Sequence, residues 1–195
     1  MSLNDNDGFP LSKVKVVNGS RRLAREKILQ ILTAHEVSDT AWQTIFSHVF
    51  FRKFNFDDKE NLVDHKILTE DEVIELESDT PIEWKEEEIL FARGLIAKVI
   101  ENKDKTDKMI IEFAANWEIE RIAKIDRLLM HLAINEMLYA PEVPTKVSIN
   151  EAIDIAKKYS TYKSGTFING ILDSIKHMLI NKGLIVKSGR GLIEK

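Results

Sequence analysis

The apolar residues of this chain recur every three or four positions, and this spacing limits the fold more than any other feature of the sequence. Such a repeat places apolar side chains on one face of an α-helix, whereas a half-buried β-strand needs strict alternation. No internal repeat of about 20 to 50 residues is present, and strands do not alternate with helices. The sequence therefore predicts an all-α helical bundle.

One long helix stands out in the second half of the chain. Its apolar positions follow helical spacing from about Ile119 to Tyr139, and Pro141 and Pro144 come directly after it. Proline cannot continue a helix, so the helix should end at this point. We expect it to pack centrally, with Leu129 in the core.

Residues that favour helix ends divide the other helical segments. Ser20 can cap the first helix, and Gly183 is expected to stop the last one. Two pairs have capping-box spacing, namely Thr69 with Glu72 and Ser148 with Glu151. We therefore expect a short helix after Thr69 and another that opens at Ser148.

The same reading divides the chain into parts. Residues 1–19 read as a flexible lead. Residues 20–118 form an expected N-terminal helical subdomain, in which residues 54–88 are an acidic insertion. Residues 119–182 form an expected C-terminal helical subdomain. Residues 183–195 alternate only weakly, which leaves a small hairpin or a basic tail as alternatives.

The formal net charge of −4 hides an uneven distribution. Residues 11–35 hold six basic side chains against one acidic one, and residues 174–195 hold five against one. Residues 57–88, in contrast, hold 14 acidic side chains against three basic ones. A basic stretch attracts polyanions, although a charge run is more often a solvated face.

The sequence lacks the motifs that several classes of enzyme, metal-binding protein and membrane protein require. There is no cysteine, no glycine-rich phosphate loop, no nucleophile motif of the G-x-S-x-G type and no H-E-x-x-H motif. The five histidines are scattered, with no two at i, i+4. No apolar run is long enough to span a bilayer. We expect a cytoplasmic protein that is not an enzyme and needs no cofactor or metal.

Arginines at the start of the first helix favour a nucleic-acid ligand. Arg21 and Arg25 are one turn apart, which places two guanidinium groups on one face. Cations at a helix start oppose the helix dipole at a cost of about 0.3–1 kcal/mol each, so helix stability does not explain them. A solubilising helix end remains the alternative.

Three stretches of the chain together resemble the NusB family of bacterial transcription antitermination factors. They are SRRLAREKILQIL at Ser20–Leu32, AKIDRLLMHLAINEML at Ala123–Leu138, and VPTKVSINEAIDIAKKY followed by SGTFINGILD at Ser164–Asp173. The last pair of motifs is the most specific. The resemblance implies a bundle of two packed helical subdomains without catalytic activity. It also implies binding of the boxA element of single-stranded nascent RNA together with NusE, a small-subunit ribosomal protein. Such a complex helps RNA polymerase to read through termination signals, notably in ribosomal RNA operons.

The resemblance also implies site residues. The expected RNA contacts are Arg21, Arg22, Arg25, Lys146, Lys163, Ser164 and Phe167. Lys163 departs from the acidic or polar residue of relatives, and a lysine should increase the attraction for phosphate. Phe167 also belongs to an apolar stripe, so core packing and base stacking are both open for it.

For NusE, the resemblance points to an exposed face of the long helix that carries Asp126 and Glu136. Thr33 and Asn135 stand where aromatic residues are common in the family, which makes recognition of this partner less well supported than recognition of RNA.

Two other functions remain possible from the sequence. One is a helical adaptor that binds only protein through an amphipathic face. The other is a NusB-like domain that targets a methyltransferase to RNA. The short stretch after Asp173 has no room for a Rossmann-type catalytic domain, which argues against the second alternative.

Overall fold

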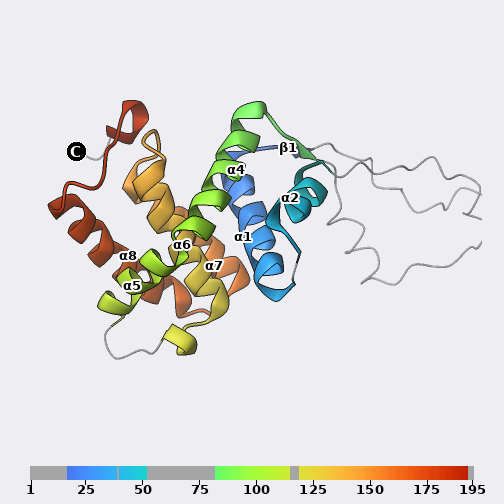
Figure 1. Ribbon diagram of the computed structural model, residues 1–195. Helices are drawn as coiled ribbons and strands as arrows, with labels where there is room; N and C mark the ends of the chain where they lie inside the picture. The colour runs from blue at the N-terminus through green and yellow to red at the C-terminus, as the bar shows by residue number, and fades with distance from the viewer. Residues whose placement is uncertain (1–16, 39, 52–81, 115–118, 193–195) are drawn as a thin grey trace, which may run out of the picture.

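The computed structural model describes residues 17–38, 40–51, 82–114 and 119–192, and this part of the chain is a bundle of α-helices (Figure 1). The elements are β1 (Val17–Asn18), α1 (Arg21–Val37), α2 (Trp42–Phe51), β2 (Ile82–Glu83), α4 (Glu86–Glu101), α5 (Lys103–Phe113), η1 (Ile119–Arg121), α6 (Lys124–Tyr139), α7 (Thr145–Tyr159), α8 (Ser164–Asn181) and η2 (Gly189–Leu192). The predicted all-α class is confirmed. The helix expected after Thr69 lies outside the described residues.

Helix α6 is the centre of the bundle. It packs against α1, α4, α5, α7 and α8, and Figure 1 shows it between the two ends of the molecule. Every residue from Leu128 to Met137 is buried, because neighbouring helices surround this part of α6. The expected central helix is therefore confirmed, but it begins at Lys124 after a separate 3-10 turn.

The remaining helices lie on two sides of α6. Helix α1 packs against α2 and α4, whereas α7 and α8 pack against each other. Helix α5 packs against α6 and α8 and so joins the side formed by the last helices. The subdomain boundary at residue 118 stays a prediction, and these contacts of α5 favour a boundary near Asn102 instead.

Three helix ends were predicted at Ser20, Gly183 and Ser148, and the first two are confirmed. The Ser20 hydroxyl accepts a hydrogen bond of 3.1 Å from the Leu23 amide, as expected of a cap. Gly183 has φ of +63° directly after α8, a conformation that favours glycine. The predicted capping box at Ser148 is wrong, because α7 already begins at Thr145 and Ser148 is buried inside it.

Two short segments link distant parts of the chain. Strands β1 and β2 pair in parallel, with Val17 opposite Ile82, and tie the entry to α1 to the entry to α4. After α8, the chain folds back onto the turn between α6 and α7, where the Ser188 amide donates to the Pro141 carbonyl at 3.0 Å. The alternative of a hairpin is not seen within residues 183–192.

None of the helices in the described parts of the chain has the length and apolar character needed to cross a membrane.

The buried centre of α6 generates the first prediction. Leu129 is fully buried, so Leu129→Ala should lower the free energy of unfolding by about 2–5 kcal/mol through lost transfer energy and a new cavity. Ile111→Ala, at a half-exposed position of α5, should change it by less than about 0.5 kcal/mol. Chemical denaturation measures both values. Equal effects of the two changes would show that the core is assigned wrongly.

Candidate nucleic-acid interface

The first turn of α1 presents two accessible arginines. No acidic residue lies in this turn, so the helix dipole is left uncompensated there. Arg21 places its guanidinium 4.1 Å from the centre of the Phe91 ring and 3.1 Å from Glu142 Oε1, in the turn between α6 and α7. Arg22 is more exposed, at 55% of its side chain. These two predicted RNA contacts are reachable from solvent.

Arg22 lies against the side of α7. Its Nη2 donates to Asp154 Oδ2 at 3.4 Å, and its Nη1 is 4.0 Å from Glu151 Oε1. A hydrogen bond from Lys157 and the charge of Arg22 together hold the pKa of Asp154 below its ordinary value. The accessible arginine therefore already shares its charge with carboxylates of the protein.

Arg25 occupies a different environment, and its assignment as an RNA contact is not supported. It is 3% exposed, and it makes two hydrogen bonds to the fully buried carboxylate of Glu136, one of them 3.0 Å from Nε to Oε2. Its Nη1 is also 3.6 Å from Glu151 Oε2. Arg25 is one helical turn from Arg21, but its side chain lies between α1 and the residues of α6 and α7 that it contacts. It is therefore not on the surface.

Glu26, one turn after Arg22, continues the contact between α1 and α7. Its Oε2 accepts hydrogen bonds of 2.7 Å from both Lys158 Nζ and Tyr159 OH. Burial alone would raise the pKa of Glu26, but these bonds outweigh burial and lower it. We call the set of ion pairs between α1 and the segment 142–158 the α1–α7 seam: Arg21–Glu142, Arg22–Glu151, Arg22–Asp154, Arg25–Glu151 and Glu26–Lys158.

Lys146 and Lys163 lie at opposite ends of α7. Lys146 is exposed in the first turn, and Lys163 is exposed in the connection to α8. A helix of 15 residues is about 22 Å long, so the two lysines cannot meet at one point. Lys146 shares one face of α7 with Asp154 and Lys157, at spacings of eight and eleven residues. The predicted cations therefore form a track along α7 and do not converge.

Ser164 and Phe167 support the fold at the start of α8. Ser164 is 3% exposed, and its hydroxyl lies 3.0 Å from the Ser160 hydroxyl and 2.8 Å from that of Thr161. This burial does not support Ser164 as an RNA contact, and that role stays a prediction. Phe167 is half-buried and packs against the hydrophobic core, which favours the core alternative for this ring.

The predicted partner face of α6 is not a surface. Asp126 is 5% exposed in the first turn of α6, and Glu136 is held by Arg25. Asn135 is also buried, where its side chain donates to the His131 carbonyl at 2.9 Å and accepts from Asn102 at 3.2 Å. The expectation of exposed carboxylates at Asp126 and Glu136 is wrong, because both residues are buried.

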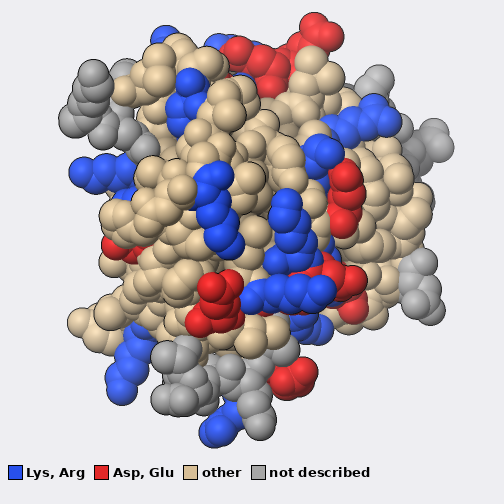
Figure 2. Space-filling model, turned by 60° about the vertical axis from the view of Figure 1, so that its left-hand side comes forward, with Lys and Arg blue, Asp and Glu red and all other residues tan. Residues whose placement is uncertain are grey.

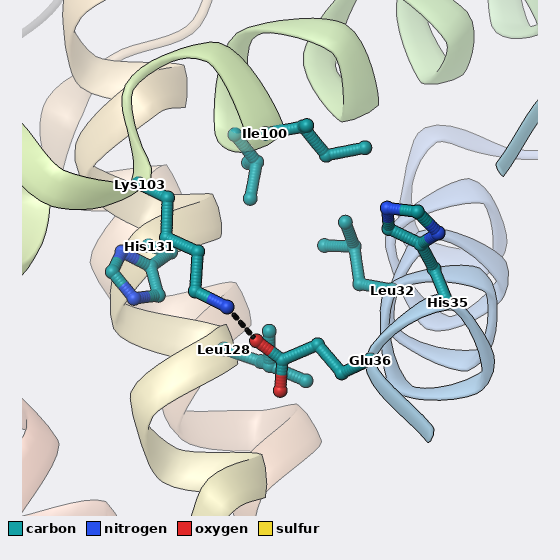
Figure 3. Close-up of a pocket in the computed structure, with 8 residues that line it drawn as sticks. Leu32, His35, Glu36, Ile100, Lys103, Leu128 and His131 are labelled. Carbon is teal, nitrogen blue, oxygen red and sulfur yellow. Dashed lines mark hydrogen bonds and ion pairs between the residues drawn. The ribbon is translucent and has the colours of Figure 1, made fainter. Parts of the chain in front are cut away.

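A pocket of about 200 Å³ opens between α1, α4 and α6 (Figure 3). Lys103 and Glu36 form an ion pair of 2.5 Å at its edge, and Figure 3 shows His131 beside Lys103. The described residues contain no group of three or more acidic, histidine or cysteine side chains placed to hold a metal ion.

His131 belongs to a polar cluster that fixes α5 on α6. It contacts the Thr106 hydroxyl through Nδ1, and its Nε2 is 3.0 Å from Asp107 Oδ1. Arg127 donates to the same carboxylate, with 2.8 Å from Nε to Oδ1. Burial would raise the pKa of Asp107, but contacts with His131 and Arg127 outweigh it and hold that pKa far below its ordinary value. The cluster therefore has a structural role in joining α5 to α6, and it contains no exposed reactive group.

Sequence reasoning missed Lys157 and Lys158, which stand in the last turn of α7. Both are exposed, and both pair with carboxylates of the seam or its neighbours. Lys157 stands eleven residues after Lys146, a helical spacing that would have placed both lysines on one face of α7.

Comparisons with known proteins agree on one family. The family model described as the NusB family matches residues 22–177. A transcription antitermination protein NusB from Chloroherpeton thalassium is 42% identical over 175 residues, which cover 90% of this chain and 70% of that protein. The NusB of Thermodesulfovibrio yellowstonii is 39% identical over 156 residues, which cover 80% and 90%. The NusB of Salinibacter ruber is 50% identical over 103 residues, which cover 53% and 64%.

Solved structures show the same fold. T. maritima NusB is similar with a TM-score of 0.61 and 26% identity, over 83% of this chain and 93% of that one. A structure of antitermination factors NusB and NusE in complex with dsRNA is similar with a TM-score of 0.58 over 81% of this chain and 96% of that one. At 17% identity, this second likeness concerns the fold alone.

The buried pair generates the second prediction. Arg25→Ala leaves the Glu136 carboxylate buried without its main partner and should lower the free energy of unfolding by about 3–5 kcal/mol. Arg22→Ala removes only exposed ion pairs and should cost no more than about 1 kcal/mol. Replacing both partners, as Arg25→Met with Glu136→Leu, should recover most of the loss. A double variant as unstable as Arg25→Ala would contradict this account.

Proposed function

This chain belongs to the NusB family, and we propose that it is an RNA-binding transcription antitermination factor that recognises boxA-type RNA together with NusE. Binding would take place in the bacterial cytoplasm on single-stranded nascent RNA. The resulting complex would act on RNA polymerase indirectly and promote read-through, notably of ribosomal RNA operons. No catalytic step and no cofactor is part of the proposal, since members of the family are named antitermination proteins.

The observation that carries the proposal is the track of cations along α7. Arg22, Lys146 and Lys163 are all exposed, although they come from three separate parts of the chain. Arg21 extends the track at the start of α1, where its guanidinium stacks on Phe91. A single strand of RNA can follow such a line, because its phosphates repeat along a flexible backbone. Phosphate contacts of this kind supply affinity and register.

The carboxylates of the α1–α7 seam add a condition to this binding. Glu142 and Asp154 already neutralise part of the charge of Arg21 and Arg22. A phosphate must therefore share these guanidinium groups with the carboxylates or displace them, which reduces the net gain of each contact. We infer that this protein binds RNA more weakly alone than its arginine content suggests, and that NusE strengthens the complex.

The site for NusE is not assigned to Asp126 or Glu136, which are buried. The solved complex of NusB with NusE and dsRNA shares the fold of this chain and supports NusE as the partner. A helical adaptor that binds protein alone remains the alternative, and RNA binding that falls with salt separates the two.

Salt dependence tests the RNA track. If about four phosphates are contacted, the logarithm of affinity should fall against the logarithm of salt concentration with a slope of roughly −3. Arg22→Gln and Lys163→Gln should each make the slope shallower by about 0.7, measured by fluorescence anisotropy with single-stranded boxA-type RNA. Lys105→Gln, an exposed lysine of α5, is the matched control and should change neither affinity nor slope. Losses at Lys105 without losses at Arg22 would place the RNA elsewhere.

Removal of a competing carboxylate is expected to have the opposite effect. Asp154→Asn frees Arg22 from its closest anionic partner, so RNA should bind several-fold more tightly at the same salt concentration. The control is Asp173→Asn, which removes an exposed carboxylate that pairs with Lys176 on α8. If the two variants gain equal affinity, the effect reports net charge alone and Arg22 is not at the interface.

A further inference from the structure

The C-terminal segment, residues 183–192, is held on the bundle by specific contacts. The Lys187 ammonium donates to the Ala140 carbonyl at 3.0 Å, and the Ser188 amide donates to the Pro141 carbonyl at the same distance. Gly191 is buried so close to this turn that a Cβ atom there would lie 2.1 Å from the Pro141 carbonyl oxygen. Only glycine fits at that position. The segment therefore has a defined place on the bundle.

That place adjoins the start of the cation track. The C-terminal segment sits on Ala140 and Pro141, and the next residue, Glu142, is the partner of Arg21 at 3.1 Å. The turn between α6 and α7 thus contacts both the C-terminal segment, through Ala140 and Pro141, and the first turn of α1, through Glu142. The RNA surface proposed above and the C-terminal segment are neighbours in space.

The segment also has the charge that a phosphate backbone requires. Residues 183–192 contain no Asp or Glu, and their basic side chains are Lys187 and Arg190; Lys182 directly precedes them at the end of α8. Lys182 and Arg190 are exposed. Figure 2, which turns the side with α8 and the C-terminal segment toward the viewer, shows Lys and Arg side chains on a largely uncharged surface, with Asp and Glu side chains beside several of them. Lys176 pairs with Asp173 on α8, whereas no Asp or Glu lies within residues 182–192.

We propose that residues 182–190 continue the RNA surface beyond the turn between α6 and α7, with Lys182 and Arg190 contacting phosphates of the same single strand. This inference rests on the proposed function and adds a second stretch of contacts to it. The segment lies outside residues 22–177, which match the family model. A longer RNA should then bind more tightly than one that covers only the boxA core.

The test compares two single-stranded RNAs by fluorescence anisotropy: the boxA-type core, and the core extended by several nucleotides at each end. The full chain should bind the extended RNA more tightly and with a steeper salt slope. In the variant Lys182→Gln with Arg190→Gln, the slope for extended RNA should become shallower by about 1.4, because two phosphate contacts are lost. Affinity for the core should stay unchanged. The anchoring residues Lys187, Ser188 and Gly191 are left intact, so the melting temperature should not move.

The matched control removes two exposed lysines from α5, as Lys105→Gln with Lys108→Gln, and should retain the full gain from extension. An equal loss in this control would show an effect of net charge and overturn the inference. If the Lys182 and Arg190 variant keeps the gain while Arg22→Gln weakens core binding, the inference fails and the proposed function stands. If Arg22→Gln has no effect either, the proposed function fails with it. Weaker binding of NusE, with RNA binding intact, would make the segment a protein surface and also overturn the inference.

Discussion

The buried ion pair between Arg25 and Glu136 governs how α1 meets the rest of the bundle. Burying two charges is costly, and the two hydrogen bonds between them, with Glu151 close by, offset the loss of hydration. A shift of α1 along α6 would separate the pair in a medium where an unpaired charge costs several kcal/mol. The pair thus fixes the register of α1. With that register set, Arg21 and Arg22, only one turn away, must emerge beside the turn before α7 and the side of α7.

Most of the fold could be predicted because helical periodicity is a local property. The apolar stripes located the helices, and residues with strong backbone preferences located several ends, as Ser20 and Gly183 show. The predicted start of α7 failed for a physical reason. Ser148 and Glu151 have capping-box spacing, but Pro144 precedes a chain that is already helical at Thr145. Spacing alone does not decide between two possible starts one turn apart.

The site was less predictable, because exposure depends on neighbours that are distant in sequence. Arg21 and Arg25 share a face of α1, and only the position of α6 determines that one is accessible and the other buried. The same limit applies to Asp126 and Glu136. A helix surrounded on all sides buries polar residues that its own pattern would place outside. In contrast, Lys146 and Lys163, at the two ends of α7, are exposed, since helix ends beside turns are rarely covered. Their role as RNA contacts stays a prediction.

The parallel pairing of β1 with β2 makes the entries to two helices depend on each other. It holds Val17 opposite Ile82 and Asn18 opposite Glu83, directly before α1 and α4. The first turn of α1, which carries Arg21 and Arg22, is therefore placed in part by a strand that the chain reaches only after α2. A displacement of the start of α4 would also displace these two arginines.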